Sequence, residues 1–184
     1  MSRPNLSRRN PRRHGKTDSS PDICVVGGAG HVGLPLALVF ASKFKRVLIY
    51  DINEKVLETI GQGKVPFMED GAETLLQSAL KRGLLELSCD PSRIRAASTV
   101  VITIGTPVDE FMNPDTKVMH TCIDRLLPNL RDGQLIVLRS TVYPGTTQWL
   151  CNYLKERGKR VHLAFCPERV VQGFAIEEVK KLPQ

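Results

Sequence analysis

The sequence predicts an α/β fold: a doubly wound parallel sheet in a single domain. From Asp22 onward, short runs of β-branched and apolar residues alternate with longer amphipathic stretches. This alternation is expected where helices cover both faces of a buried parallel sheet. The chain has 184 residues, of which 41% are hydrophobic. That is enough for one sizeable core but short for two full domains.

The expected strands and helices follow one another along the chain. Apolar, β-rich runs predict strands at 23–27, 46–51, 84–88, 99–105, 134–140 and 160–165, of which 84–88 is the weakest. Helical periodicity predicts helices at 31–43, 54–61, 71–82, 116–130, 146–157 and 175–181. Thr146, just ahead of an apolar helix, is the expected N-cap of that helix.

The positive charge is concentrated at the N-terminus. The formal net charge is +7, but residues 1–20 hold six Lys or Arg residues against Asp18, so the rest of the chain carries only +2. This polar tail cannot bury enough apolar surface to fold, and we expect it to be disordered. A solvated extension is favoured over a nucleic-acid-binding arm, because neither aromatic residues nor a binding fold accompany the arginines.

The composition also predicts where in the cell the protein is located and whether it has disulfide bonds or a metal site. Since no apolar run reaches the length of about 18 residues that a membrane span needs, and no hydrophobic segment follows the N-terminal arginines, we expect a soluble cytoplasmic protein without a membrane partner. The five cysteines and four histidines are scattered, with no C-x-x-C pair and no metal-ligand spacing. Neither disulfide bonds nor a metal site is therefore expected.

A glycine-rich motif follows the first predicted strand. Gly28, Gly30 and Gly33 match G-x-G-x-x-G between a buried strand and an apolar helix, and Gly27 lies outside this spacing. Gly28 is expected to permit the tight turn, Gly30 to let the backbone approach a pyrophosphate, and Gly33 to let the helix pack on the strand. The start of the helix, at His31 and Val32, would face the dinucleotide.

An acidic residue at the end of the second strand makes this motif more specific. Asp51 lies about 20 residues beyond the glycines, where a carboxylate grips a ribose 2′-hydroxyl. A carboxylate there would repel a 2′-phosphate, so NAD is favoured over NADP, on a Rossmann-type fold. The alternative is that the glycines only form a turn and that Asp51 caps the next helix.

Further segments of the chain resemble the UDP-glucose/GDP-mannose dehydrogenase family over residues 22–184. Besides the glycine motif, which continues to Pro35, they are Pro66-Phe67-Met68-Glu69-Asp70-Gly71, Ile104-Gly105-Thr106-Pro107-Val108-Asp109-Glu110, Arg139-Ser140-Thr141-Val142-Tyr143-Pro144-Gly145-Thr146-Thr147, and Phe165-Cys166-Pro167-Glu168-Arg169 followed by Gly173. Five motifs in the family's order are far more specific than one.

The resemblance implies roles for residues that follow the predicted strands. Thr106 and Thr141 would contact the cofactor at the carboxyl ends of their strands, and Thr141 and Glu168 would belong to the catalytic site. Glu168 would act as a general base or position a water together with Thr141. The alternatives are a cap or turn role for each threonine, and for Glu168 an exposed loop acid paired with Arg169.

Two departures from the family pattern bear on the ligands. The family's basic residue after the ribose-binding acid corresponds to Lys55, one residue closer than usual, which implies a contact with a cofactor phosphate. Gln172 stands where UDP-glucose dehydrogenases have a second glutamate. Because Pro167-Glu168-Arg169 looks more like members that oxidise N-acetylated UDP-hexosamines, the resemblance favours the UDP-N-acetylmannosamine dehydrogenase branch.

The family reaction oxidises the C6 alcohol of a UDP-sugar to a carboxylate with two NAD, through a thioester on a cysteine in a second half of the enzyme. Cys166 is not expected to replace that cysteine, since it follows a hydrophobic strand and no basic residue stands beside it. We therefore expect the NAD-binding half of a nucleotide-sugar 6-dehydrogenase, truncated and inactive alone, with a UDP-sugar substrate and a complementing C-terminal half as partners. The alternative is a non-catalytic NAD-binding or interaction module.

Overall fold

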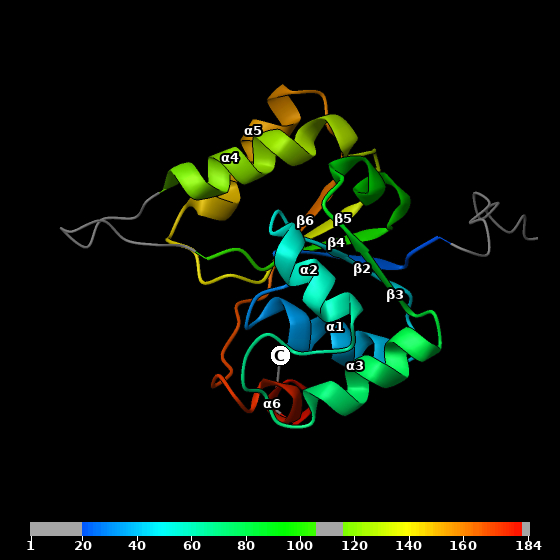
Figure 1. Ribbon diagram of the computed structural model, residues 1–184. Helices are drawn as coiled ribbons and strands as arrows, with labels where there is room; N and C mark the ends of the chain where they lie inside the picture. Colours follow the sequence, from blue (N-terminus) through cyan, green and yellow to red (C-terminus); the bar gives the residue numbers. More distant parts are fainter. Residues whose placement is uncertain (1–19, 106–115, 182–184) are drawn as a thin grey trace, which may run out of the picture.

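Six parallel strands form the central sheet, in the order β3-β2-β1-β4-β5-β6. The computed structural model that contains this sheet describes residues 20–105 and 116–181 (Figure 1). The strands are β1 (Ile23–Val26), β2 (Val47–Tyr50), β3 (Leu85–Ser88), β4 (Thr99–Ile102), β5 (Leu135–Leu138) and β6 (His162–Phe165). The chain steps outward from β1 to β3, returns to β4 beside β1 and steps outward the other way, which confirms the predicted doubly wound, Rossmann-type fold.

Helices cover both faces of the sheet (Figure 1). One face carries α4 (Thr116–Leu126), α5 (Thr146–Glu156) and the 3₁₀ turns η1 (Pro91–Ala96) and η2 (Leu127–Asn129). The other face carries α1 (Gly33–Ser42), α2 (Glu54–Gly61), α3 (Ala72–Lys81) and α6 (Ala175–Lys181). Each face therefore has its own hydrophobic core.

Successive strand residues contribute to the two cores in turn. On β2, Leu48 and Tyr50 are buried in the core with α4 and α5, whereas Ile49 is buried in the core with α1. This alternation follows from the two-residue period of a strand, and it explains why strands covered on both faces are apolar throughout.

The register aligns the ends of the three central strands. Val26 of β1 lies opposite Tyr50 of β2 on one side and Ile102 of β4 on the other. The sheet's order reverses between β1 and β4, and the residues that follow these strands share one edge. Ligands of open α/β sheets bind at such a position.

Most predicted elements are present, with shorter ends. The predicted strand 99–105 ends at Ile102, and the predicted helix 116–130 ends at Leu126 and continues as η2, which contains Pro128. A proline lacks the amide that an α-helix needs to continue. The 3₁₀ turn η1 was not predicted. The tail at 1–19 and Thr106 lie outside the described residues.

Within residues 20–105 and 116–181, no helix is long and apolar enough to cross a membrane. The same part of the chain contains no group of three or more His, Cys, Asp or Glu side chains that could hold a metal ion.

Glu69 joins the loop before α3 to the last helix. Its buried carboxylate accepts hydrogen bonds from the backbone amides of Gly173 and Ile176, both at 3.0 Å. The amide of Asp70 in turn donates to the Gly173 carbonyl at 3.0 Å. These bonds fix the start of α6 against α1, where Ile176 is buried in the core.

We predict that Glu69→Ala destabilises the domain by about 1–3 kcal/mol, because it leaves two backbone amides without their acceptor. Urea denaturation gives the free energy of unfolding, and hydrogen exchange of the Ile176 amide gives the local effect. Glu58→Ala, at an exposed site on α2, is the control and should change little. Equal losses in the two variants would contradict the role of Glu69.

Candidate functional site

The glycine loop packs against the strand ends too closely for side chains. A Cβ atom added to Gly33 would lie 2.4 Å from the Gly27 carbonyl oxygen and 2.6 Å from the Gly28 Cα. A Cβ atom on Gly28 would lie 2.7 Å from the Val25 carbonyl oxygen. These distances agree with the close packing predicted for Gly33, and they show that Gly28 is also required for packing.

The tight turn begins at Gly27 and includes Gly28, because the Gly30 amide donates to the Gly27 carbonyl at 3.2 Å. Gly27 has φ +74°, in the left-handed region that favours glycine. The hydroxyl of Thr103, just after β4, donates to the Val26 carbonyl at 2.8 Å. Thr103 thus holds the loop from the neighbouring strand, and the motif gave no signal for it. Gly30 is exposed at the loop's surface, where its backbone is open to a ligand.

Asp51 connects the end of β2 to the glycine loop. One carboxylate oxygen, Oδ2, accepts a hydrogen bond from the Ala29 amide at 3.0 Å, and Oδ1 accepts one from the Asn53 amide at 3.0 Å. The N-cap of α2 is Asn53, whose side chain accepts from the Val56 amide. The alternative that Asp51 caps this helix is therefore wrong. Since a carboxylate has about four acceptor sites, Asp51 can still accept from ribose hydroxyls.

A cavity of about 560 Å³ opens beside Gly30 and Asp51, at the ends of β1, β2 and β4. Its apolar lining includes Val26, Ile52, Ile104 and Val118, and its polar lining includes Asp51, Tyr50, Thr121 and Arg125. A largely apolar cavity with a few convergent polar groups is typical of a cofactor site. Thr106, predicted to contact the cofactor here, lies outside the described residues.

The predicted cofactor residues His31, Val32 and Lys55 are not among the described residues that line this cavity. Val32 is the N-cap residue of α1, and His31 precedes it. The His31 ring stacks on Phe67 at 4.1 Å between centroids and lines a second cavity, of about 850 Å³, near Gln172. Its side chain thus lines a different cavity from Asp51. Lys55 is exposed in the first turn of α2 and is not among the described residues that line the first cavity.

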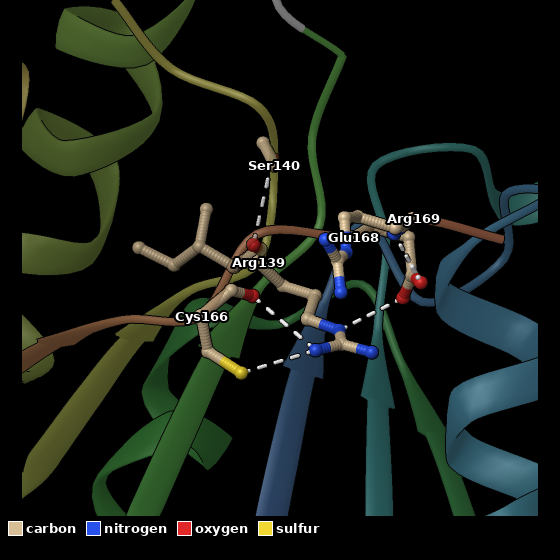
Figure 2. Close-up of polar contacts among 6 residues, drawn as sticks. Arg139, Ser140, Cys166, Glu168 and Arg169 are labelled. Atoms are coloured by element: carbon tan, nitrogen blue, oxygen red, sulfur yellow. Dashed lines mark hydrogen bonds and ion pairs between the residues drawn. The ribbon is translucent and has the colours of Figure 1, made fainter. Parts of the chain in front are cut away.

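Figure 2 shows a second polar cluster, at the ends of β5 and β6. The Arg139 guanidinium lies between Glu168 and Cys166: its Nε donates to Glu168 Oε2 at 2.8 Å, and one of its terminal nitrogens lies 3.1 Å from Cys166 Sγ. The two side chains of the ion pair are only 5% and 9% exposed. Glu168 Oε1 accepts from the Arg169 backbone amide at 2.8 Å.

This cluster corrects two expectations. Glu168 is not an exposed acid paired with the Arg169 side chain, because it is buried and its ionic partner is Arg139. A basic group does stand beside Cys166, although none adjoins it in sequence. Arg139 was missed as a site residue, since only the meeting of β5 with β6 brings it to Glu168.

Thr141 follows the same strand as Arg139 and is exposed. The Glu168 amide donates to the Arg139 carbonyl at 2.9 Å, so segments 139–141 and 166–168 run side by side. The N-cap of α5 is Gly145, with φ +88°, and Thr146 is the first residue of the helix. The predicted cap role of Thr146 is therefore wrong, because the chain enters α5 through a left-handed turn.

Comparisons with known proteins identify what this architecture is similar to. The family model described as UDP-glucose/GDP-mannose dehydrogenase family, NAD binding domain, matches residues 21–184. The UDP-N-acetyl-D-mannosamine dehydrogenase of Methanococcus aeolicus is 35% identical over 161 residues, which are 85% of this chain and 36% of that protein.

Solved structures of similar proteins have the same fold. The GDP-mannose dehydrogenase of Pseudomonas aeruginosa, solved as a ternary complex, superposes with a TM-score of 0.82 at 27% identity, over 88% of this chain and 39% of that one. The UDP-D-ManNAc dehydrogenase of Pyrococcus horikoshii gives 0.80 at 29% identity, over 85% and 38%. The chain thus spans less than two fifths of the length of these proteins.

We predict that Arg139→Leu destabilises the domain by about 3–5 kcal/mol, because it leaves the Glu168 carboxylate buried without its partner. Arg160→Leu is the matched control: Arg160 pairs with Asp132 at the same 2.8 Å, but the side chains are 88% and 46% exposed. Its loss should be small. Urea denaturation gives the free energy of unfolding of both variants. A similar free energy for Arg139→Leu and the control would contradict the stabilising role of the buried ion pair.

Proposed function

Since the chain belongs to the UDP-glucose/GDP-mannose dehydrogenase family, we propose that it binds NAD across the carboxyl ends of β1, β2 and β4. The observation that carries this proposal is the bond from the Ala29 amide to Asp51, which places the carboxylate beside the glycine loop and the 560 Å³ cavity. An anion-binding loop, a ribose-binding acid and a mainly apolar cavity thus adjoin one another.

The residues of the loop fit the parts of the dinucleotide. The backbone at Gly30, His31, Val32 and Gly33 would hold the pyrophosphate, because the first amides of α1 have no partner within the helix and carry the positive end of its dipole. Asp51 would accept the ribose hydroxyls and would repel a 2′-phosphate. Thr106 and Lys55 are further proposed contacts. NAD, when bound, supplies the hydride acceptor.

We propose a UDP-sugar as the substrate, oxidised at its C6 alcohol. Thr141 and Glu168 would act together beside the sugar, with Glu168 accepting a proton or orienting a water. Glu168 Oε2 accepts one hydrogen bond from Arg139, and Oε1 accepts one from the Arg169 amide. Each oxygen has a second acceptor site, which can bind that water. Gln172 and the similarity to UDP-N-acetyl-D-mannosamine dehydrogenases support an N-acetylated UDP-hexosamine.

We propose further that oxidation to a carboxylate requires a complementing polypeptide. Going from an alcohol to a carboxylate removes two hydrides, and a covalent thioester intermediate retains the sugar between them. The relatives are more than twice as long as the aligned part of this chain. The nucleophilic cysteine would come from a polypeptide that corresponds to their remaining length.

A non-catalytic NAD-binding or interaction module is the second candidate. The observation that favours it is the engagement of Glu168: a buried ion pair and a backbone bond hold both oxygens of its carboxylate. In that case Glu168 would stabilise the loop after β6, and NAD would serve as a bound ligand rather than as an oxidant.

NAD should bind to the purified chain, and NADP much more weakly. We predict that Asp51→Asn reduces the affinity for NAD by about tenfold or more, since a hydrogen bond to a charged acceptor contributes about 1.5–3 kcal/mol. Isothermal titration calorimetry with both dinucleotides provides the test, and Asp132→Asn, at an exposed acid, should leave the affinity unchanged. Equal binding of NAD and NADP would contradict the ribose contact.

The chain alone should not reduce NAD in the presence of UDP-N-acetylmannosamine or UDP-glucose, because the covalent step has no nucleophile. NADH absorbance measures turnover, and calorimetry on the same sample confirms that the protein binds NAD. Turnover by the purified chain would rule out the need for a complementing polypeptide.

A further inference from the structure

The Tyr50 hydroxyl is buried at the end of β2 without a hydrogen-bond partner. Tyr50 is 2% exposed, and its Oη is the one buried side-chain nitrogen or oxygen that lacks a partner among the described residues. Buried polar groups are nearly always paired, because leaving one unpaired costs its hydration energy without return. An orphaned hydroxyl therefore requires an explanation.

The hydroxyl group belongs to a residue that lines a ligand cavity. Tyr50 and Asp51 are consecutive, and both line the 560 Å³ cavity. Asp51 is where the proposed ribose is held. Ile52, which follows β2, and Val118 of α4 also line the cavity and make part of its wall apolar. A flat aromatic base attached to that ribose would suit this part of the cavity: its faces would contact the apolar walls, and its polar edge would meet the hydroxyl.

Arg125 of α4 provides a second polar group at the same place. It lines the cavity with Tyr50. Its guanidinium is close enough to the Tyr50 hydroxyl to act on its pKa as a hydrogen-bonding neighbour, but the two groups make no hydrogen bond of normal distance and angle among the described contacts. Burial raises the pKa of Tyr50, and the adjacent Arg125 guanidinium opposes part of that rise. The hydroxyl thus stays protonated at neutral pH and can donate or accept, while the guanidinium can only donate.

We propose that the Tyr50 hydroxyl, supported by Arg125, binds the polar edge of the adenine base of NAD and makes the cavity selective for that base. This proposal rests on the proposed function, in which Asp51 holds the adenosine ribose. The ring nitrogens of adenine accept hydrogen bonds, and its amino group donates them, so the base would supply the partner that the Tyr50 hydroxyl lacks. In this proposal the hydroxyl gains a hydrogen bond of normal geometry when the base binds, so its removal affects affinity more than folding.

ADP and UDP provide a direct test, because they share the ribose and the diphosphate and differ in the base. NADH fluorescence measures binding of the reduced cofactor to the full chain, and displacement of NADH by ADP or UDP gives their dissociation constants. We expect ADP to bind more tightly than UDP. In Tyr50→Phe, the ratio of the UDP constant to the ADP constant should fall by about two- to tenfold, the range for one hydrogen bond.

Two further variants separate this effect from damage to the fold. Tyr153→Phe removes a hydroxyl that bonds Asp124 of α4, and neither residue lines the cavity, so its ratio should equal that of the unmodified chain. Arg125→Gln, at an exposed position, should lower the ratio as Tyr50→Phe does. The melting temperature of Tyr50→Phe without ligand should not fall, since the lost hydroxyl had no partner.

The outcomes distinguish this proposal from the proposed function. If NADH binds and the ratio is the same in the unmodified chain, Tyr50→Phe and Arg125→Gln, the base contact is wrong and NAD binding stands. If NADH does not bind to the unmodified chain, both proposals fail. Should Tyr50→Phe not fold, an unchanged ratio in Arg125→Gln would by itself overturn the base contact.

Discussion

The site at the ends of β1, β2 and β4 depends on the close approach of the glycine loop to those strands. Gly33 lets α1 begin against the backbone of Gly27 and Gly28, where a single added Cβ would collide with main-chain atoms. The loop is then fixed from both neighbouring strands, by Asp51 after β2 through the Ala29 amide and by Thr103 after β4 through the Val26 carbonyl. The backbone that we propose to bind the pyrophosphate is consequently fixed without a ligand, which would lower the entropy cost of binding.

The ends of β5 and β6 are held by a different kind of interaction. There a buried ion pair, Arg139 with Glu168, replaces the backbone packing of the glycine loop. Desolvation offsets much of the attraction within such a pair, so its net contribution to folding is small, whereas the removal of one partner is costly. The pair therefore acts mainly on geometry: it fixes one Glu168 oxygen, and the Arg169 amide fixes the other.

The fold could be predicted because its signals are local. Apolar runs, helical periodicity and the glycine spacing each lie within a few residues, and Asp51 follows its strand directly. Tyr50, Arg125 and Arg139 could not be found in this way, because their importance comes from partners that only the folded sheet brings near. The same limit explains why the left-handed conformation of Gly27 was not predicted and why the N-cap of α5 is Gly145 rather than Thr146. Backbone conformation at adjacent glycines is set by packing rather than by spacing alone.

The segment between β6 and α6 is fixed at both of its ends. Figure 1 shows it passing from the edge of the sheet to the face covered by α1. It is fixed at its start, where Glu168 pairs with Arg139 of β5, and at its end, where Glu69 binds the amides of Gly173 and Ile176. Gln172, between these anchors, consequently lies beside the second cavity with His31 from the start of α1. Residues more than a hundred positions apart thereby meet at this cavity. Because Glu69 itself lines the cavity, a change at Glu69 would alter both the cavity and the support of the segment that carries Glu168.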